Sequence, residues 1–164
     1  MKENKIEFSY LQFENSEQLS EADAQLLEKA REVTKQAYAP YSNFNVGAVA
    51  ILENGSFVSG TNQENASYPV GICAERVLLG NAATQYPGIA IKAIAISYRS
   101  SHDASDKPIS PCGMCRQALV EYEVRMNHPI RVILSGLSGE VQIIEKANFL
   151  LPFAFTSSNL NKSK

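Results

Sequence analysis

The chain contains few cysteines and histidines, and this scarcity limits the kinds of site that it can carry. Among its 164 residues there are three cysteines and two histidines. An odd number of cysteines argues against a framework of paired disulfides, which small secreted domains often need. Free thiols persist in a reducing compartment. The cysteine content therefore predicts a cytoplasmic protein.

Excess charge of one sign and long hydrophobic runs are also missing. Fifteen basic residues stand against seventeen acidic ones, so the net charge is −2 at pH 7. A surface for nucleic acid or an anionic membrane needs a clear excess of Lys and Arg, so we expect neither partner. No stretch is apolar over the roughly 20 residues that a membrane-spanning helix requires, and the N-terminal residues lack the apolar run of a signal peptide.

The composition that remains is typical of a globular protein. Hydrophobic residues make up 45% of the chain and charged residues 20%, and a chain of this length can bury a substantial core. No internal repeat or linker interrupts it. We therefore expect one domain over residues 1–164, with residues 1–19 as an N-terminal extension and residues 156–164 as a flexible polar tail.

Apolar periodicity predicts alternating helices and strands. A helix begins after Ser20 and stops before Pro40, and residues 5–13 alternate as a possible edge strand. Further helices are predicted over 73–85 and 112–123, and strands over 46–52, 56–62, 89–97, 130–135 and 140–145. This order predicts an α/β fold, a three-layer α/β/α sandwich around a mixed five-stranded sheet. The short link between the last two strands requires them to be antiparallel.

All three cysteines lie where two of these helices begin. Cys73 opens the first, and Cys112 and Cys115 open the second. Free amides and the helix dipole favour negative charge at a helix N-terminus, so thiols there ionise readily to the thiolates that bind zinc. Both helices follow core strands, so we expect their N-termini to meet at one edge of the sheet. Three thiolates would leave zinc one open position, which is the catalytic arrangement.

Two other interpretations of the cysteines stay open at this point. Cys112 and Cys115 could form a redox dithiol, although such a motif explains neither Cys73 nor the proline before Cys112. A closed structural zinc site would need a fourth ligand, for which His102 and His128 are the candidates. Both histidines occur in polar segments that we expect to be exposed.

Charged residues beside the cysteines suit catalysis. Glu75 follows Cys73 by two residues, next to the expected open position, and is spaced to move protons rather than to bind metal; the alternative is an ordinary first-turn helix acid. Three thiolates carry one negative charge more than a zinc ion neutralises. We therefore expect Arg76 or Arg116 to donate hydrogen bonds to the thiolates, the alternative for each being a solvated helix face.

Cys73-Ala74-Glu75 followed by Pro111-Cys112-Gly113-Met114-Cys115 resembles the signature of zinc-dependent nucleobase deaminases. Four further stretches resemble the small homotetrameric cytidine deaminases, namely Tyr41-Ser42-Asn43-Phe44-Asn45-Val46-Gly47-Ala48, Asn62-Gln63-Glu64-Asn65-Ala66-Ser67-Tyr68-Pro69, Ile72-Cys73-Ala74-Glu75-Arg76 and Leu150-Leu151-Pro152-Phe153-Ala154-Phe155. The likeness covers about residues 22–155. It departs from the family pattern at Met114 and Phe153, where smaller residues are common.

The resemblance implies a role for each of these residues. Cys73, Cys112 and Cys115 bind one zinc ion per subunit, and Glu75 passes protons from water to N3 of the base and to the departing amine. The substrate contacts that it implies are Phe44 against the base, the backbone around Ala74 at the base edge, Asn62 and Glu64 at the ribose 3′-hydroxyl, and Tyr68 and Phe155 reaching an adjacent subunit's site. For Phe44 and Phe155 the alternative is core packing, and for the two polar residues it is loop solvation.

The activity implied is hydrolysis of cytidine and 2′-deoxycytidine to uridine and 2′-deoxyuridine with release of ammonia, in pyrimidine salvage, by a homotetramer whose sites are completed across subunits. One alternative is a deaminase of the same fold that acts on another aminopyrimidine nucleoside or a nucleoside antibiotic. Asn62 and Glu64 suit a free ribose and favour the ordinary nucleosides. A deaminase that acts on nucleic acid is a further alternative, but the acidic net charge argues against it. A zinc-binding module without enzymatic activity is the alternative from a different class of protein.

Overall fold

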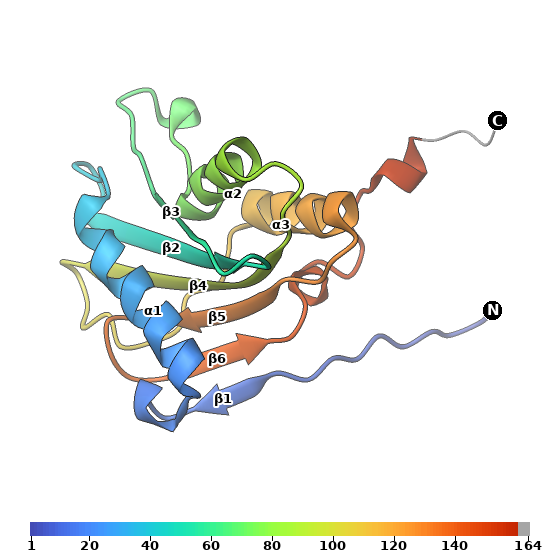
Figure 1. The fold of residues 1–164 in the computed structure, drawn as a ribbon, viewed down its shortest axis with the longest axis horizontal. Helices are drawn as coiled ribbons and strands as arrows, with labels where there is room; N and C mark the ends of the chain where they lie inside the picture. The colour runs from blue at the N-terminus through green and yellow to red at the C-terminus, as the bar shows by residue number, and fades with distance from the viewer. Residues whose placement is uncertain (161–164) are drawn as a thin grey trace.

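A mixed sheet forms the centre of the computed structural model, which describes residues 1–160 (Figure 1). The strand order is β1-β6-β5-β4-β2-β3. The strands are β1 (Leu11–Phe13), β2 (Phe44–Leu52), β3 (Phe57–Thr61), β4 (Ile91–Ser100), β5 (Arg131–Ser135) and β6 (Val141–Ile144). Only β4 and β5 pair in parallel, across a helical crossover, and the neighbouring pairs are antiparallel. The predicted antiparallel pairing of the last two strands is confirmed.

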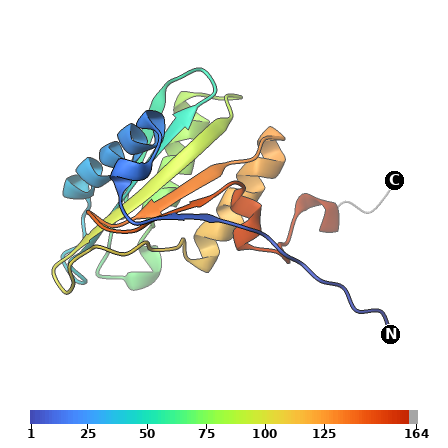
Figure 2. The ribbon, with the colours of Figure 1, turned by 90° about the horizontal axis from the view of Figure 1, so that it is seen from below.

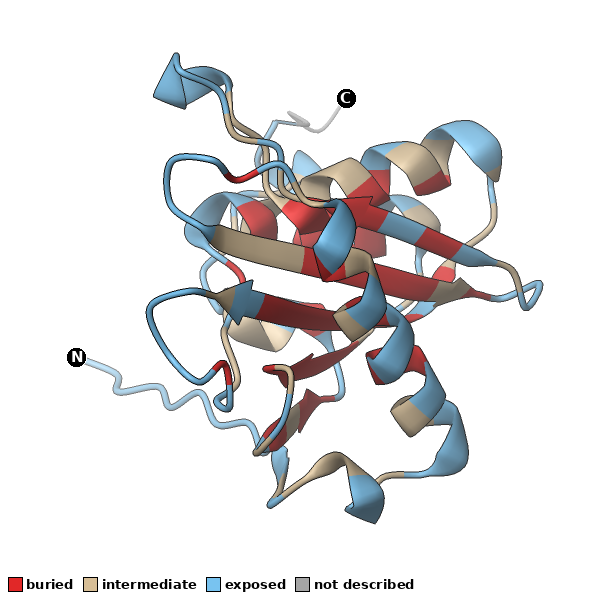
Figure 3. Cartoon of the chain, turned by 90° about the vertical axis from the view of Figure 1, so that its left-hand side faces the viewer, coloured by how far each residue is buried: buried red, intermediate tan, exposed pale blue. Residues whose placement is uncertain are grey.

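Helices cover both faces of the sheet, as predicted. They are α1 (Glu21–Val33) on one face and α2 (Ala74–Gln85) and α3 (Gly113–Met126) on the other (Figure 2). Alternate residues of β2 supply the two apolar layers, because Ala48 and Ala50 pack toward α2 and α3 while Val49 packs toward α1. The buried positions of Figure 3 follow these strands. The fold is therefore the expected three-layer α/β/α arrangement.

The sheet has six strands rather than five, because the candidate edge strand is present. Only residues 11–13 of the segment 5–13 pair, with Leu11 opposite Ile143 of β6. Since this register places Tyr10 opposite Ile144, the last residue of β6, residues 1–9 extend beyond the sheet. The first predicted helix also ends earlier than expected, at Val33, and a 3-10 turn over Thr34–Gln36 follows.

Two close contacts fix the helices against the sheet. A Cβ atom at Gly47 of β2 would lie 2.4 Å from the Ala30 carbonyl oxygen of α1, and one at Gly60 of β3 would lie 2.4 Å from the Ala74 carbonyl oxygen. Both distances are far below van der Waals contact, so glycine is required at each position. The second contact presses the first turn of α2 onto β3.

The C-terminal segment (residues 145–160) packs beside α3 and carries little regular structure. Its last described element is the 3-10 turn Ser157–Asn159, which Thr156 caps. This turn falls within the predicted flexible tail (residues 156–164), of which residues 161–164 lie outside the described residues. Within residues 1–160, no helix has both the length and the apolar character needed to cross a bilayer.

Candidate metal centre and adjoining cavity

The three cysteines meet where β3 and β4 end. Both strands run antiparallel to β2, so their carboxyl ends lie at the same edge of the sheet, beside the first residues of β2. Cys73 is the N-cap residue of α2, Cys112 is the N-cap residue of α3, and Cys115 lies in the first turn of α3. Neither N-cap side chain forms a capping hydrogen bond with the backbone of its own helix. The sulfur atoms are therefore available to a ligand.

The spacing of the three sulfur atoms fits a zinc ion. The Cys73 and Cys112 sulfurs are 3.8 Å apart, the Cys112 and Cys115 sulfurs are 3.5 Å apart, and all three lie within 4.8 Å of one another. Tetrahedral zinc with bonds of about 2.3 Å separates its sulfur ligands by about 3.8 Å. The donor set and its geometry thus agree with a zinc centre.

Within residues 1–160, the group of potential metal ligands contains these cysteines and no histidine. His102 hydrogen-bonds instead to the Ser42 carbonyl oxygen at 3.1 Å, and the His128 Nε2 lies 3.3 Å from a Glu53 carboxyl oxygen. A closed site completed by either histidine is therefore not formed. A zinc ion held by the three cysteines alone would have its fourth position open for a small ligand.

The three thiols influence one another's ionisation. The pKa of the Cys73 thiol is lowered to about 6, chiefly because the Cys115 thiol hydrogen-bonds to its sulfur. Cys112 and the positive charge of Arg76 act in the same direction, whereas burial and the Glu75 carboxylate oppose them. The same hydrogen bond raises the pKa of Cys115, which is fully buried. The Cys73 thiolate thus forms easily, and a cation among the sulfurs would favour deprotonation of Cys115.

The two arginines beside the cysteines differ in their contacts. Arg76 influences Cys73 through its charge. Arg116 points elsewhere, because its guanidinium donates hydrogen bonds to the carbonyl oxygens of Pro111 at 2.8 Å and Leu150 at 3.1 Å. Arg116 therefore ties the loop before Cys112 to the C-terminal segment instead of contacting a thiolate as expected.

Glu75 is a buried acid beside the sulfurs. Only 5% of the residue is exposed. Burial raises the pKa of its carboxyl, although a backbone amide and the Cys115 thiol oppose this effect. A carboxyl whose pKa is moved toward neutrality can both accept and return a proton near neutral pH.

A cavity of about 450 Å³ adjoins Cys73. It lies between the loop that precedes β2 and the loop that joins β3 to α2. Its lining residues are Tyr41, Ser42, Asn62, Gln63, Glu64, Asn65, Tyr68, Gly71, Ile72 and Cys73. A cavity of this volume is large enough for a small organic molecule. Of the predicted substrate contacts, Asn62, Glu64 and Tyr68 lie on its wall.

Glu64 connects the two loops that form the cavity. Its carboxylate accepts hydrogen bonds from the backbone amides of Tyr41 at 2.9 Å and Ser42 at 3.3 Å, and from the Ser42 hydroxyl. These donors, the hydroxyl foremost, lower the pKa of Glu64 despite some opposition from burial. Sequence reasoning gave Ser42 no role of its own. Its partner lies 22 residues away, so no local pattern could reveal the contact.

The amide of Asn62 extends the pairing of β2 and β3. Its Oδ1 accepts from the Val46 amide at 2.7 Å, and its Nδ2 donates to the Phe44 carbonyl at 2.9 Å. The Phe44 ring stacks on Tyr98 with centroids 4.8 Å apart, and it is not among the lining residues of the cavity. Ala74, at the first position of α2, is fully buried.

The two remaining aromatic candidates lie on different sides of the chain. Tyr68 is 75% exposed at the cavity rim, where its ring meets Tyr41 edge-on at 6.0 Å between centroids. Phe155 belongs to the C-terminal segment, and its carbonyl accepts a hydrogen bond from Gln117 of α3 at 2.7 Å. Within one chain Phe155 does not line the cavity.

A three-cysteine zinc centre at one edge of an α/β/α sandwich, with a buried acid and a cavity beside it, defines a zinc-dependent hydrolase. The family model described as the cytidine and deoxycytidylate deaminase zinc-binding region matches residues 20–127. The chain therefore belongs to the cytidine and deoxycytidylate deaminase family.

Individual proteins of this family are similar over most of their length. A cytidine deaminase of Halalkalibacterium halodurans is 37% identical over 83% of this chain and 96% of its own, and one of Sporosarcina psychrophila is 35% identical over 83% and 93%. The crystal structure of cytidine deaminase from Burkholderia pseudomallei is 37% identical, with a TM-score of 0.70 over 84% of this chain and all of that one.

Proposed function

We propose that the chain hydrolyses cytidine and 2′-deoxycytidine to uridine and 2′-deoxyuridine and releases ammonia. The observation that carries this proposal is the position of Glu75 beside three sulfurs arranged for zinc, at a cavity of about 450 Å³. Related cytidine deaminases of similar length support the choice of substrate. In the reaction a C–O bond to water oxygen forms at C4 of the base, and the C4–N bond to the amine breaks.

Glu75 moves the protons in this mechanism. Zinc, when bound by the three cysteines, acts as a Lewis acid that makes water nucleophilic near neutral pH. Glu75 takes one proton from the water and gives it to N3 of the base. It then takes the remaining proton from the oxygen bonded to C4 and gives it to the departing amine, which leaves as ammonia. Its raised pKa suits both directions of transfer, because the carboxyl does not hold its charge as strongly as an exposed glutamate.

The substrate is proposed to bind along the cavity wall. Glu64 and Asn62 have acceptor capacity left for the ribose 3′-hydroxyl, while backbone groups around Ala74 read the base edge. Phe44 is proposed to lie against the base, which requires its ring to use the side that does not stack on Tyr98. Glu64 can hold the ribose and the loop at Tyr41 and Ser42 together, because a carboxylate accepts about four hydrogen bonds.

Replacing Glu64 tests the ribose contact. Glu64→Gln keeps the shape of the side chain but has only one acceptor oxygen and no charge, so the KM for cytidine is expected to rise about 10-fold or more, as for the loss of a charged hydrogen bond. The turnover number should change little if binding is weakened equally in the ground and transition states. Steady-state kinetics with Glu32→Gln, an exposed acid on α1, provide the control. An unchanged KM would remove Glu64 from the site.

Replacing Arg76 tests the electrostatic support of the thiolates. Arg76→Ala removes the positive charge that favours the Cys73 thiolate, so zinc should be released to a chromophoric chelator about 10-fold faster. Arg125→Ala, an exposed position on α3, should release zinc at the wild-type rate. Wild-type zinc retention and turnover in Arg76→Ala would contradict the role of the arginine.

The assembly is proposed to be a homotetramer in which Tyr68 and Phe155 contribute to a neighbouring subunit's site. Their large exposed aromatic surfaces support this proposal, since 75% of Tyr68 and 59% of Phe155 is accessible in one chain. Sedimentation equilibrium at several protein concentrations measures the assembly directly. A monomer at all concentrations would reject it.

A cytoplasmic location and a role in pyrimidine salvage complete the proposal. The cysteines support the location. All three are free and the Cys73 thiol ionises easily, so they would be oxidised outside a reducing compartment unless zinc is bound. Free nucleosides are the substrates that a salvage enzyme uses.

An ammonia-release assay on a small panel of compounds tests the activity. Zinc-loaded protein is incubated with cytidine, 2′-deoxycytidine, CMP and adenosine, and ammonia is measured over time. Cytidine and 2′-deoxycytidine should be hydrolysed. Activity on adenosine alone would overturn the substrate, and a zinc-replete protein that leaves every compound unchanged would indicate a structural zinc module.

A further inference from the structure

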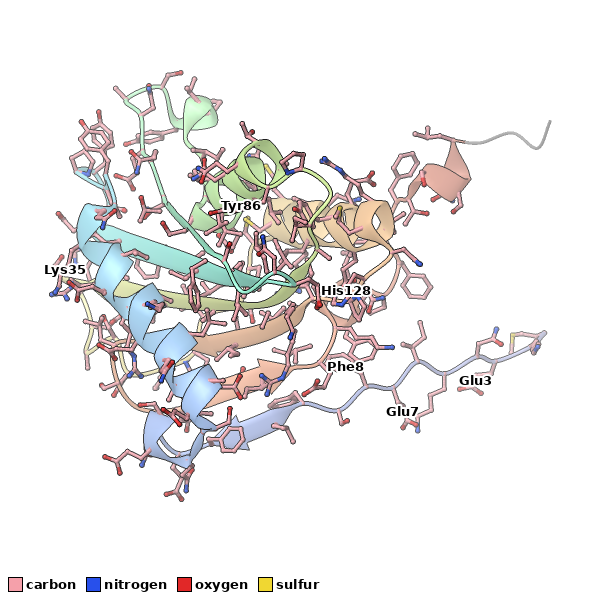
Figure 4. All side chains as sticks on the ribbon, viewed as in Figure 1. Glu3, Glu7, Phe8, Lys35, Tyr86 and His128 are labelled. Carbon is pink, nitrogen blue, oxygen red and sulfur yellow. The ribbon has the colours of Figure 1, made fainter. Side chains whose placement is uncertain are left out.

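Residues 1–10, here named the N-terminal arm, extend from the sheet edge without a partner strand. Every residue of the arm is exposed, and pairing with β6 begins only at Leu11. The arm projects from the body of the protein in Figure 1, and Figure 4 shows Glu3, Glu7 and Phe8 along it. The family model starts at residue 20, so the arm lies outside the region shared with the family.

The arm exposes apolar side chains in the pattern of a strand. Ile6, Phe8 and Tyr10 alternate with polar residues and are 57%, 46% and 50% exposed. An extended segment with unpaired backbone groups and an apolar alternation is a template for pairing with another strand. Phe8 also stacks on Phe149 of the C-terminal segment, with centroids 5.6 Å apart, and this contact anchors the base of the arm.

We propose that the arm is a dimerisation element that pairs antiparallel with the arm of a second copy of this chain, centred on Ile6. The charges favour this register over the two adjacent symmetric registers. Lys5 and Glu7 flank Ile6 and form an ion pair within one chain. In a two-fold pairing centred on Ile6, Lys5 of each copy lies opposite Glu7 of the other, so both cross-strand contacts are attractive.

The neighbouring symmetric registers bring like charges together. A pairing centred on Lys5 sets that lysine opposite its own copy, and one centred on Glu7 does the same for the glutamate. Like charges directly opposite each other destabilise a strand pair. In the Ile6 register the two isoleucines meet, and Phe8 lies opposite Asn4. The interface is isologous, which means that both copies use the same surface. Each arm therefore pairs with one other arm, and this contact does not extend into a filament.

Symmetric crosslinking tests this register. In zinc-loaded full-length Ile6→Cys, the two new cysteines face each other, so mild oxidation should convert most of the protein to a covalent dimer on a non-reducing gel. Tyr10→Cys is the matched control, because its cysteines would be about 26 Å apart along the paired arms at 3.3 Å per residue. Its crosslinking should stay at the wild-type level. No dimer from Ile6→Cys, or equal dimer from both variants, overturns the proposal.

Charge reversal in the Ile6→Cys background provides the second test. Adding Lys5→Glu makes both cross-strand contacts repulsive and should reduce dimer yield several-fold, whereas adding Lys5→Glu together with Glu7→Lys should restore it. A double reversal that fails to restore crosslinking rejects the register. Zinc content confirms that each variant is folded. Because the readout is a crosslink, it is independent of whether cytidine is the substrate.

Discussion

Glu75→Gln is expected to keep its zinc and to lose turnover of cytidine by roughly 10²–10⁴-fold, the range that proton transfer by a positioned side chain contributes. Glutamine has nearly the same shape and fills the same buried space, but it cannot accept the proton from water. The three sulfurs are untouched, so the metal stays. Loss of turnover without loss of zinc separates the chemical role of Glu75 from a structural one.

The measurement for this variant combines zinc analysis with single-turnover kinetics. Glu121→Gln, an exposed acid on α3, makes the same chemical change on the surface and should retain wild-type turnover. Turnover of Glu75→Gln within a few-fold of the wild type would remove the residue from the mechanism. Equal loss of zinc and turnover would mean that Glu75 supports the metal centre instead.

Cys115→Ser is expected to abolish both zinc binding and activity. A serine hydroxyl does not ionise near neutral pH, so only two thiolates remain for the metal. Cys115 is fully buried in the first turn of α3, and zinc links that turn to the start of α2. Structural zinc contributes about 10–16 kcal/mol in small peptides, so loss of even part of this linkage should lower the melting temperature.

Zinc stoichiometry and thermal unfolding measure the two effects of Cys115→Ser. Met114→Ala serves as the control, because Met114 lies in the same turn but is 63% exposed. It should bind zinc fully and melt near the wild-type temperature. Stoichiometric, tightly held zinc in Cys115→Ser would show that the centre does not depend on three thiolates.

Local patterns in the sequence were sufficient for the metal centre. Cys73 and Cys112 are recognisable as helix starts because apolar residues at helical spacing follow each, and the strand before the second helix has a near-continuous apolar run. Those features fix both elements and, through the sheet, bring the sulfurs to one edge. The antiparallel pairing of the last two strands follows from the short link between them, whereas the full strand order was not predicted.

Contacts between residues far apart in the chain could not be predicted from local patterns in the sequence. The hydrogen bonds of Glu64 to the loop at Tyr41 and Ser42 span more than 20 residues. A periodic pattern of apolar residues therefore gives no indication of them. The stacking of Phe44 on Tyr98 likewise joins β2 to β4. Residues 5–9 have no partner in β6 because that strand ends opposite Tyr10, which is a property of β6 and not of the N-terminal sequence.

The proposed activity depends on one zinc ion held by three cysteines with a fourth position open to water. X-ray absorption at the zinc edge of the purified protein tests it most directly. The expected spectrum fits three sulfur ligands at about 2.3 Å and one oxygen ligand at about 2.0 Å. A histidine nitrogen or a fourth sulfur in place of the oxygen would contradict it.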